Sequence, residues 1–116
     1  MSTPVGPYTP LVKAGPWYIC SGQLGIKDGR LVEGGLKEEL KQALTNLESL
    51  LKTEGMTLQH VVKTTVFLAD IAQYADMNEV YSEIFGSYRP ARSAIGVAGL
   101  PIGASVEIEA WAYLEK

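Results

Sequence analysis

This 116-residue chain has few of the residues that build metal centres or covalent cross-links, since it contains one cysteine and one histidine. A single cysteine cannot form a disulfide within the chain. Zinc sites in proteins usually use several Cys and His ligands, and this chain has one of each. No apolar run approaches the roughly 18 residues of a membrane-spanning helix. The first residues lack the charged-then-apolar pattern of a signal peptide. We therefore expect a soluble cytoplasmic protein with no metal site and no membrane contact.

An excess of positive charge is also absent. Lys and Arg number 10 against 13 Asp and Glu, which gives a net charge of -3. Proteins that bind nucleic acid through its phosphates are usually basic, so we expect no nucleic-acid partner. The 47% hydrophobic and 20% charged residues are ordinary for a globular protein. The length fits a single domain over residues 1–116.

The N-terminal third predicts an arm, a strand and a hairpin. Three of the six prolines lie within residues 1–10, which favours an extended, irregular arm. Residues 17–22 are aromatic and β-branched and predict a strand. Asp28 and Gly29 stand between two short apolar stretches, as in a two-residue β-hairpin.

Two segments have the apolar spacing of amphipathic helices. The first begins at Leu36 and is followed by Gly55 as a stop signal. The second follows Asp70, which can cap it together with Gln73. The predicted apolar stripes are Leu36, Leu40, Ala43, Leu44, Leu47, Leu50 and Leu51, then Ile71, Tyr74, Met77, Tyr81, Ile84 and Phe85. The Glu and Lys residues of the first helix are interpreted as a solvated face.

Alternating β-prone residues predict three more strands, at 61–68, 92–98 and 105–113. In the first of these we expect Val62, Thr64, Val66 and Leu68 to share one face, and we expect the last two strands to pair as a hairpin. Two helices with single apolar stripes can cover only one face of a sheet. The predicted fold class is therefore α+β, with a mixed five- to six-stranded sheet and both helices packed on one face.

The face that the helices leave uncovered is predicted to be aromatic rather than polar. It carries Trp111, Tyr113 and Phe67. These rings would form an exposed apolar patch in a monomer. We therefore expect this face to pack against copies of itself in a homo-oligomer.

One group of charged residues could carry chemistry. Alternation in the predicted hairpin places Arg92, Ala94 and Gly96 on one face with Glu107 and Glu109. A guanidinium there is suited to binding a carboxylate, and a neighbouring glutamate can hold or activate a water molecule. A cross-strand ion pair between Arg92 and either glutamate explains the same pattern without catalysis. The spacing does not decide between these two interpretations.

The other candidate residues give weaker signals. Cys20 lies in an apolar strand without a neighbouring base, so it is interpreted as a buried structural thiol. His60 is interpreted as a surface or capping residue. Tyr8 is compatible with an anchor for the arm and with a ring over a pocket. Gly22 is compatible with close approach of a ligand and with a β-bulge.

Several of these segments together resemble the Rid (reactive intermediate deaminase) family, also called the YjgF or L-PSP family. The similarity covers nearly the whole chain, and its pieces occur in the family's order and spacing. The most telling part is Pro90-Ala91-Arg92-Ser93 followed by residues 106–110. The matching segments are 6–8, 21–23, 62–70, 77–81, 90–93 and 100–110.

The resemblance implies a chorismate-mutase-like fold and a homotrimer with sites between subunits. It also implies hydrolysis of reactive enamines and imines, such as 2-aminoacrylate, to 2-keto acids and ammonia, with no cofactor. By position, Arg92 would bind the substrate carboxylate and Glu107 would position the attacking water. The resemblance further implies that Tyr8, Gly22 and Asn78 line the pocket.

One departure concerns Ala94, because many close members of the family have a cysteine there. If that position contributes mainly its backbone carbonyl to the water, alanine serves equally well. If the thiol matters, the rate or the substrate preference differs.

Alternative functions remain. One is a non-catalytic trimer that binds small carboxylates such as keto acids for regulation. Another is a ribonuclease or translation inhibitor, which the net negative charge disfavours. Chorismate mutase activity is disfavoured, because a dianionic substrate needs several cationic groups in one site. The chain has only three arginines in all, Arg30, Arg89 and Arg92.

Overall fold

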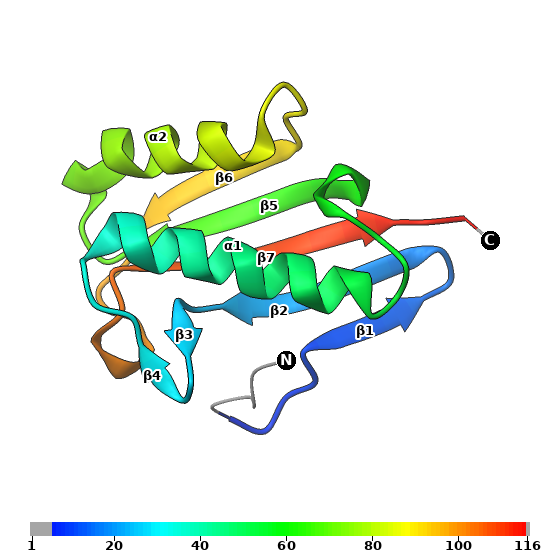
Figure 1. The fold of residues 1–116 in the computed structure, drawn as a ribbon, viewed down its shortest axis with the longest axis horizontal. Helices are drawn as coiled ribbons and strands as arrows, with labels where there is room; N and C mark the ends of the chain where they lie inside the picture. The colour runs from blue at the N-terminus through cyan, green and yellow to red at the C-terminus, as the bar shows by residue number, and fades with distance from the viewer. Residues whose placement is uncertain (1–5, 116) are drawn as a thin grey trace.

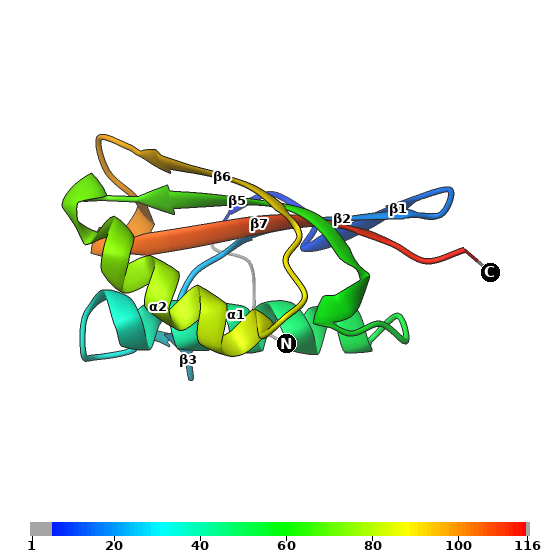
Figure 2. The ribbon, with the colours of Figure 1, turned by 90° about the horizontal axis from the view of Figure 1, so that it is seen from above.

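The protein is built from two layers, a mixed five-stranded sheet and a pair of α-helices (Figure 1). The computed structural model describes residues 6–115. The helices α1 (Leu36–Lys52) and α2 (Tyr74–Phe85) lie on the same side of the sheet, and its other side is bare (Figure 2). The strands of this sheet are β1 (Leu11–Ala14), β2 (Trp17–Gln23), β5 (Val61–Leu68), β6 (Ala91–Gly96) and β7 (Val106–Tyr113). The predicted fold class, α+β with two helices on one face, is confirmed.

The strand order in the sheet is β1-β2-β7-β5-β6. All neighbours are antiparallel except β5 and β6, which are parallel. β1 and β6 are therefore the edge strands.

No helix among residues 6–115 has the length and apolar character needed to cross a membrane.

The predicted hairpin around Asp28 forms a separate two-stranded sheet, β3 (Ile26–Lys27) with β4 (Arg30–Leu31). Asp28 and Gly29 have φ angles of 54° and 79°, the left-handed values that a tight two-residue hairpin turn requires. The side chain of Asn46 in α1 donates hydrogen bonds to the carbonyl oxygens of Leu24 and Ile26, at 3.1 and 2.9 Å. These bonds attach the hairpin to the helix layer.

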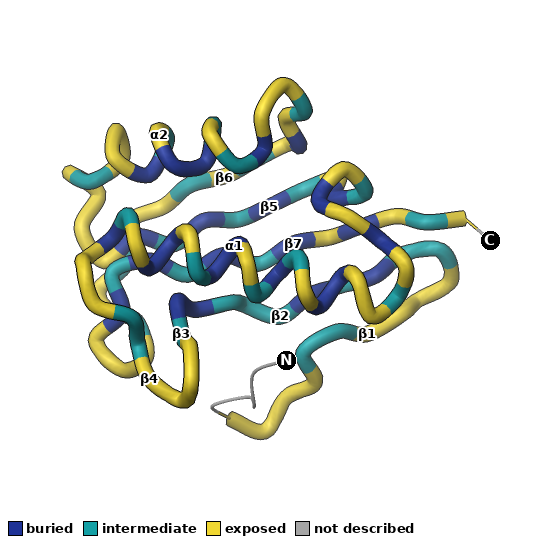
Figure 3. Tube along the Cα trace, viewed as in Figure 1, coloured by how far each residue is buried: buried dark blue, intermediate teal, exposed yellow. Residues whose placement is uncertain are grey.

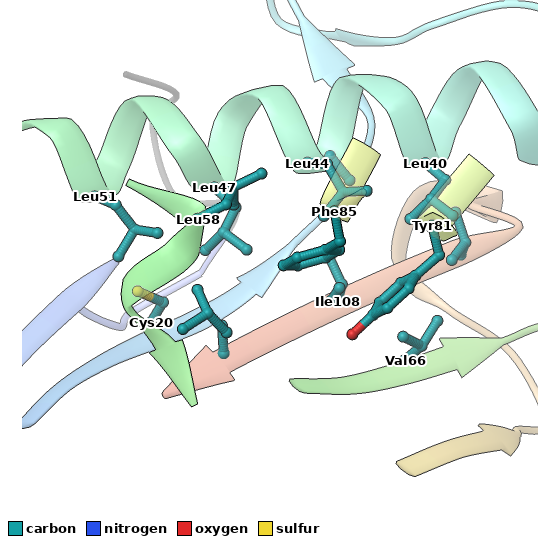
Figure 4. Close-up of a cluster of buried hydrophobic side chains, with 14 of the residues drawn as sticks. Cys20, Leu40, Leu44, Leu47, Leu51, Leu58, Val66, Tyr81, Phe85 and Ile108 are labelled. Carbon is teal, nitrogen blue, oxygen red and sulfur yellow. The ribbon is translucent and has the colours of Figure 1, made fainter. Parts of the chain in front are cut away.

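The core lies between the helices and the sheet (Figures 3 and 4). All seven residues of the predicted stripe in α1 are buried. They pack against the inner residues of the sheet, among them Val66, Ile108 and Cys20. Within the core, the hydroxyls of Thr64 and Tyr81 form a hydrogen bond at 2.8 Å, so neither of the two is left unsatisfied.

The second helix differs from its prediction at the start. Asp70 caps a short 3₁₀ turn, η2 (Ile71–Gln73), by accepting a hydrogen bond from the N–H of Ala72. The α-helix begins only at Tyr74, and Ile71 and Tyr74 are exposed rather than part of the core. The first two residues of the predicted stripe therefore lie outside the core.

Two predictions about the strands are wrong. A β-bulge between Val61 and Lys63 shifts the start of β5, so Val61 faces the core and Val62 is exposed. β6 and β7 do not form a hairpin, because β5 lies between them. Residues 97–105, which include the 3₁₀ turn η3 (Pro101–Gly103), carry the chain across the end of β5.

This pairing places the charged residues on opposite faces of the sheet, contrary to the prediction. Arg92 is paired with Thr64, and Ala94 with Val66, on the face that the helices cover. Phe67 is paired with Glu107 on the bare face. Gly96 follows Arg92 and Ala94, and Glu109 follows Glu107. We call the bare side the open face.

The open face is aromatic, as predicted. The ring of Trp17 lies edge-on to those of Trp111 and Tyr113, with centroids 6.1 and 5.0 Å apart. Trp111 remains 43% exposed and Ile95, also on this face, 45%. Self-association through this surface stays a prediction.

We expect Leu47→Ala to lower the free energy of unfolding by about 2–5 kcal/mol, because it leaves a cavity in a fully buried part of the core. The matched control is Ser49→Ala, which lies on the exposed side of the same helix. The free energies of unfolding of the wild type and both variants are compared by urea titration at the same protein concentration. Equal losses for both variants would contradict the assigned core.

Candidate functional site

Arg92 is held at the edge of the sheet by side chains of α2. Its NH2 donates a hydrogen bond to the Tyr74 hydroxyl at 3.0 Å, and its NH1 contacts the Met77 sulfur at 3.5 Å. The guanidinium carbon lies 4.8 Å from the centroid of the Tyr81 ring and 5.5 Å from that of Tyr74. These three partners recur at helical spacing, so one face of α2 surrounds the guanidinium. We call them the Arg92 cage.

No carboxylate pairs with Arg92 among residues 6–115. The predicted alternative, a cross-strand ion pair with Glu107 or Glu109, is therefore wrong. It fails because those glutamates lie on the opposite face and two strands away.

Two other predicted site residues lie on the same side of the sheet as Arg92. Ala94 follows it in β6 and is partly buried against the core. Asn78 is one helical turn after Tyr74 in α2 and is half-buried. Arg92, Ala94 and Asn78 therefore all lie on the helix side of the sheet.

Glu107 and Gly22 form a second group on the other side. A Cβ at Gly22 would lie 2.4 Å from Glu107 Oε2, so a larger residue there would displace this carboxylate from its present position. Gly22 lies in the irregular part of β2, where the pairing with β7 shifts between Cys20 and Gln23. The bulge interpretation of Gly22 is confirmed. The group closest to its backbone is the Glu107 side chain, and close approach of a ligand stays a prediction.

Tyr8 belongs to the arm that runs beside this second group. Ser21 ties the arm to β2, because its N–H donates to the Pro10 carbonyl at 2.8 Å and its hydroxyl to the Thr9 carbonyl at 2.7 Å. Tyr8 itself is exposed. The predicted arm is described from Gly6 onward, and residues 1–5 lie outside the described part.

The electrostatic setting of Glu107 suits proton transfer. Partial burial raises the pKa of its carboxyl group, and the negative charge of Glu109 raises it further. A carboxylate with a raised pKa takes up and releases a proton closer to neutral pH.

Glu39 was missed by the sequence analysis, which placed the glutamates of α1 on a solvated face. It is buried, and its Oε1 accepts a hydrogen bond from the N–H of Ser105 at 2.7 Å. The Ser105 carbonyl accepts from the N–H of Ala69 at 3.0 Å. These bonds fix the start of β7 just before Glu107. Helical spacing could have indicated this burial, because residue 39 is three positions after Leu36 and so lies on the side of the helix that carries the apolar stripe.

Cys20 and His60 play the structural parts that were predicted. Burial raises the pKa of the Cys20 thiol to about 11, so the thiol stays protonated and unreactive. His60 Nδ1 accepts a hydrogen bond from the N–H of Thr57 at 3.0 Å and caps the 3₁₀ turn η1 (Leu58–His60).

Within residues 6–115, no group of three or more His, Cys, Asp or Glu side chains is arranged to hold a metal ion. A hollow of about 330 Å³ lies on the helix side, between Glu48, η1 and the C-terminal end of α2. None of the predicted site residues lines it.

Comparison with known proteins identifies the family. The family model described as endoribonuclease L-PSP matches residues 1–114. The chain belongs to this family, the Rid or YjgF family. A RutC family protein of Pyrococcus horikoshii is 44% identical over 114 residues, which cover 97% of this chain and 90% of that protein.

Other members of the Rid family carry a named activity or a solved structure. The human 2-iminobutanoate/2-iminopropanoate deaminase is 47% identical over 108 residues, covering 91% of this chain and 79% of that protein. The crystal structure of RidA from an Antarctic Psychrobacter bacterium is similar, with a TM-score of 0.93 and 38% identity. That match covers 97% of this chain and 92% of the other.

We expect Glu109→Gln to lower the pKa of Glu107, because it removes a neighbouring negative charge that opposes ionisation. The shift is measured by NMR titration of side-chain-labelled glutamate, with Glu107→Gln assigning the resonance. Glu54→Gln, remote from the site, serves as the control. An unchanged or higher pKa in Glu109→Gln would contradict the coupling.

Proposed function

We propose that this protein hydrolyses reactive 2-imino acids and their enamine tautomers, such as 2-aminoacrylate, to 2-keto acids and ammonia. The main observation behind the proposal is that the Arg92 guanidinium is held in place but has no carboxylate partner among residues 6–115. Its guanidinium is oriented by the Arg92 cage at an edge strand and is paired with no carboxylate of the described chain. Such a group is suited to binding a substrate carboxylate through two parallel hydrogen bonds. The activity for which the bovine and human relatives are named, 2-iminobutanoate/2-iminopropanoate deaminase, supports the same reaction.

We further propose that the active site lies between subunits of a homotrimer. Within one protomer, Arg92 and Glu107 project from opposite faces of the sheet, so a single small molecule cannot contact both side chains of the same chain. β6 is an edge strand, and the exposed aromatic rings of the open face favour burial against another copy. A closed ring that joins the β6 edge of one copy to the Glu107 side of the next would bring the two groups together.

In this site each group has a distinct task. Arg92 binds the carboxylate and aligns the C=N carbon. The Glu107 carboxylate orients a water and accepts one of its protons as the oxygen adds to that carbon. The resulting carbinolamine loses ammonia when its nitrogen is protonated, and the C=O bond of the keto acid forms. One water is consumed and one ammonia released. Holding water and imine together lowers the entropic part of the barrier.

The remaining predicted residues would line the pocket. Asn78 and Ala94 would come from the Arg92 side, and Tyr8 and Gly22 from the Glu107 side. Ala94 has no side-chain donor or acceptor, so only its backbone carbonyl could contact the water. Gly22 supports the Glu107 carboxylate by leaving it room.

The reaction is tested by coupling the protein to a pyridoxal-phosphate dehydratase that generates 2-aminoacrylate, and by following keto acid and ammonia. We expect the wild type to accelerate their release, and Arg92→Ala to lose at least about 100-fold in kcat/KM because the substrate is no longer bound and aligned. Arg89→Ala is the matched control, since the one hydrogen bond of the Arg89 side chain within residues 6–115 goes to the Gly86 carbonyl.

Two results would contradict the proposed enzyme. One is a wild type that releases no keto acid faster than buffer yet binds keto acids through Arg92, which would favour a regulatory binding protein. The other is a wild type that cleaves RNA but forms no keto acid faster than buffer, which would favour a ribonuclease.

The shared site is tested by mixing two inactive variants, Arg92→Ala and Glu107→Gln. If the subunits are unfolded and refolded together, about a quarter of the sites in random trimers should combine an intact Arg92 with an intact Glu107. Activity should therefore return to about a quarter of the wild-type value per site. Variants refolded separately and then combined are the control. A mixture as inactive as its components would place both residues of the site within one chain and contradict the arrangement.

A further inference from the structure

The hydroxyl of Tyr74 stands out within the Arg92 cage. The ring is 43% exposed and lies in the first turn of α2, beyond the core. Its oxygen accepts a hydrogen bond from Arg92 at 3.0 Å. Tyr74 contributes nothing to the packed core, in contrast to Met77 and Tyr81, which are buried. Folding therefore does not explain a hydroxyl at this position.

The proton of this hydroxyl has no acceptor among residues 6–115. The Tyr74 oxygen takes part in one hydrogen bond, as acceptor from Arg92, so its own O–H is available as a donor. The N–H groups of Arg92 that face neither Tyr74 nor Met77 are likewise without a partner in the described chain. Donors from two residues thus lie side by side at the exposed end of the cage.

We propose that Tyr74 is a second binding residue for the substrate carboxylate, donating its O–H while Arg92 donates N–H bonds. The inference rests on the proposed function. A carboxylate has about four acceptor positions, so a guanidinium alone does not saturate it. Accepting a bond from a cation polarises the phenol and makes its O–H a stronger donor. The class of ligand this pair selects is a small planar α-keto or α-imino carboxylate.

Tyr74 would also act before substrate arrives. With its oxygen as acceptor and its ring beside the guanidinium, it keeps Arg92 turned along α2 rather than into solvent. The same hydroxyl then stays beside the guanidinium when the carboxylate binds. The ring serves only the first role and the hydroxyl serves both, so the two roles are separated by comparing ligands with and without a carboxylate.

The test compares Tyr74→Phe, which keeps the ring, with wild type. We expect the Kd for 2-oxobutanoate and the KM for the imino acid to rise about ten- to a hundredfold, the range for losing a hydrogen bond to a charged group, with kcat within about twofold. Binding of the neutral analogue 2-oxobutanamide should be unchanged. Tyr18→Phe is the matched control, because it removes a hydroxyl that is buried without a hydrogen-bond partner.

Several results would overturn the inference. If Tyr74→Phe keeps the wild-type Kd and KM while wild type is active, Tyr74 donates nothing to the carboxylate, and the proposed function stands. If kcat falls at unchanged KM, or if the amide loses affinity equally, Tyr74 only positions Arg92. If wild type neither forms keto acid nor binds 2-oxobutanoate, the proposed function itself fails, and this inference with it.

Discussion

The two-residue alternation of side chains along a strand is the constraint on which this structure depends. Because α1 and α2 cover one face of the sheet, every second residue of the central strands is committed to the core. Arg92 points to the covered side and Glu107 to the open side, so their separation is fixed by the backbone and not by side-chain rotamers. This separation is the reason why the proposed site is placed between two copies of the chain.

Each side of the sheet prepares its group differently. On the covered side, the Arg92 cage anchors a cation with aromatic rings, a thioether and a phenol, none of which competes for its charge. On the other side, the carboxylate of Glu107 is partly desolvated, lies near a like charge and is given space by Gly22. Glu39 fixes the start of the strand that carries it. The first arrangement favours binding of an anion and the second favours proton transfer.

Local pattern was sufficient for most of the secondary structure. The apolar stripe from Leu36 to Leu51 predicted α1, and Asp28-Gly29 predicted a turn that only left-handed φ angles allow. The bare aromatic face was predicted because two helices with single apolar stripes can cover only one face of a sheet of this size. Pattern was insufficient for β6, because it placed Arg92 on the same face as Glu107, whereas the pairing with β5 turns Arg92 to the covered face. A strand with alternating residue types fits either face, and only its neighbours decide which.

By itself, the sequence determined the elements, the single covered face, the family and the identity of the residues proposed to act, because these depend on local spacing and on side-chain chemistry. The tertiary structure alone decided that β5 lies between β6 and β7, that Arg92 and Glu107 are on opposite faces, and that Tyr74 bonds to the guanidinium. Strand pairing joins segments far apart in the chain, and the alternation within one strand is the same for every partner it could have.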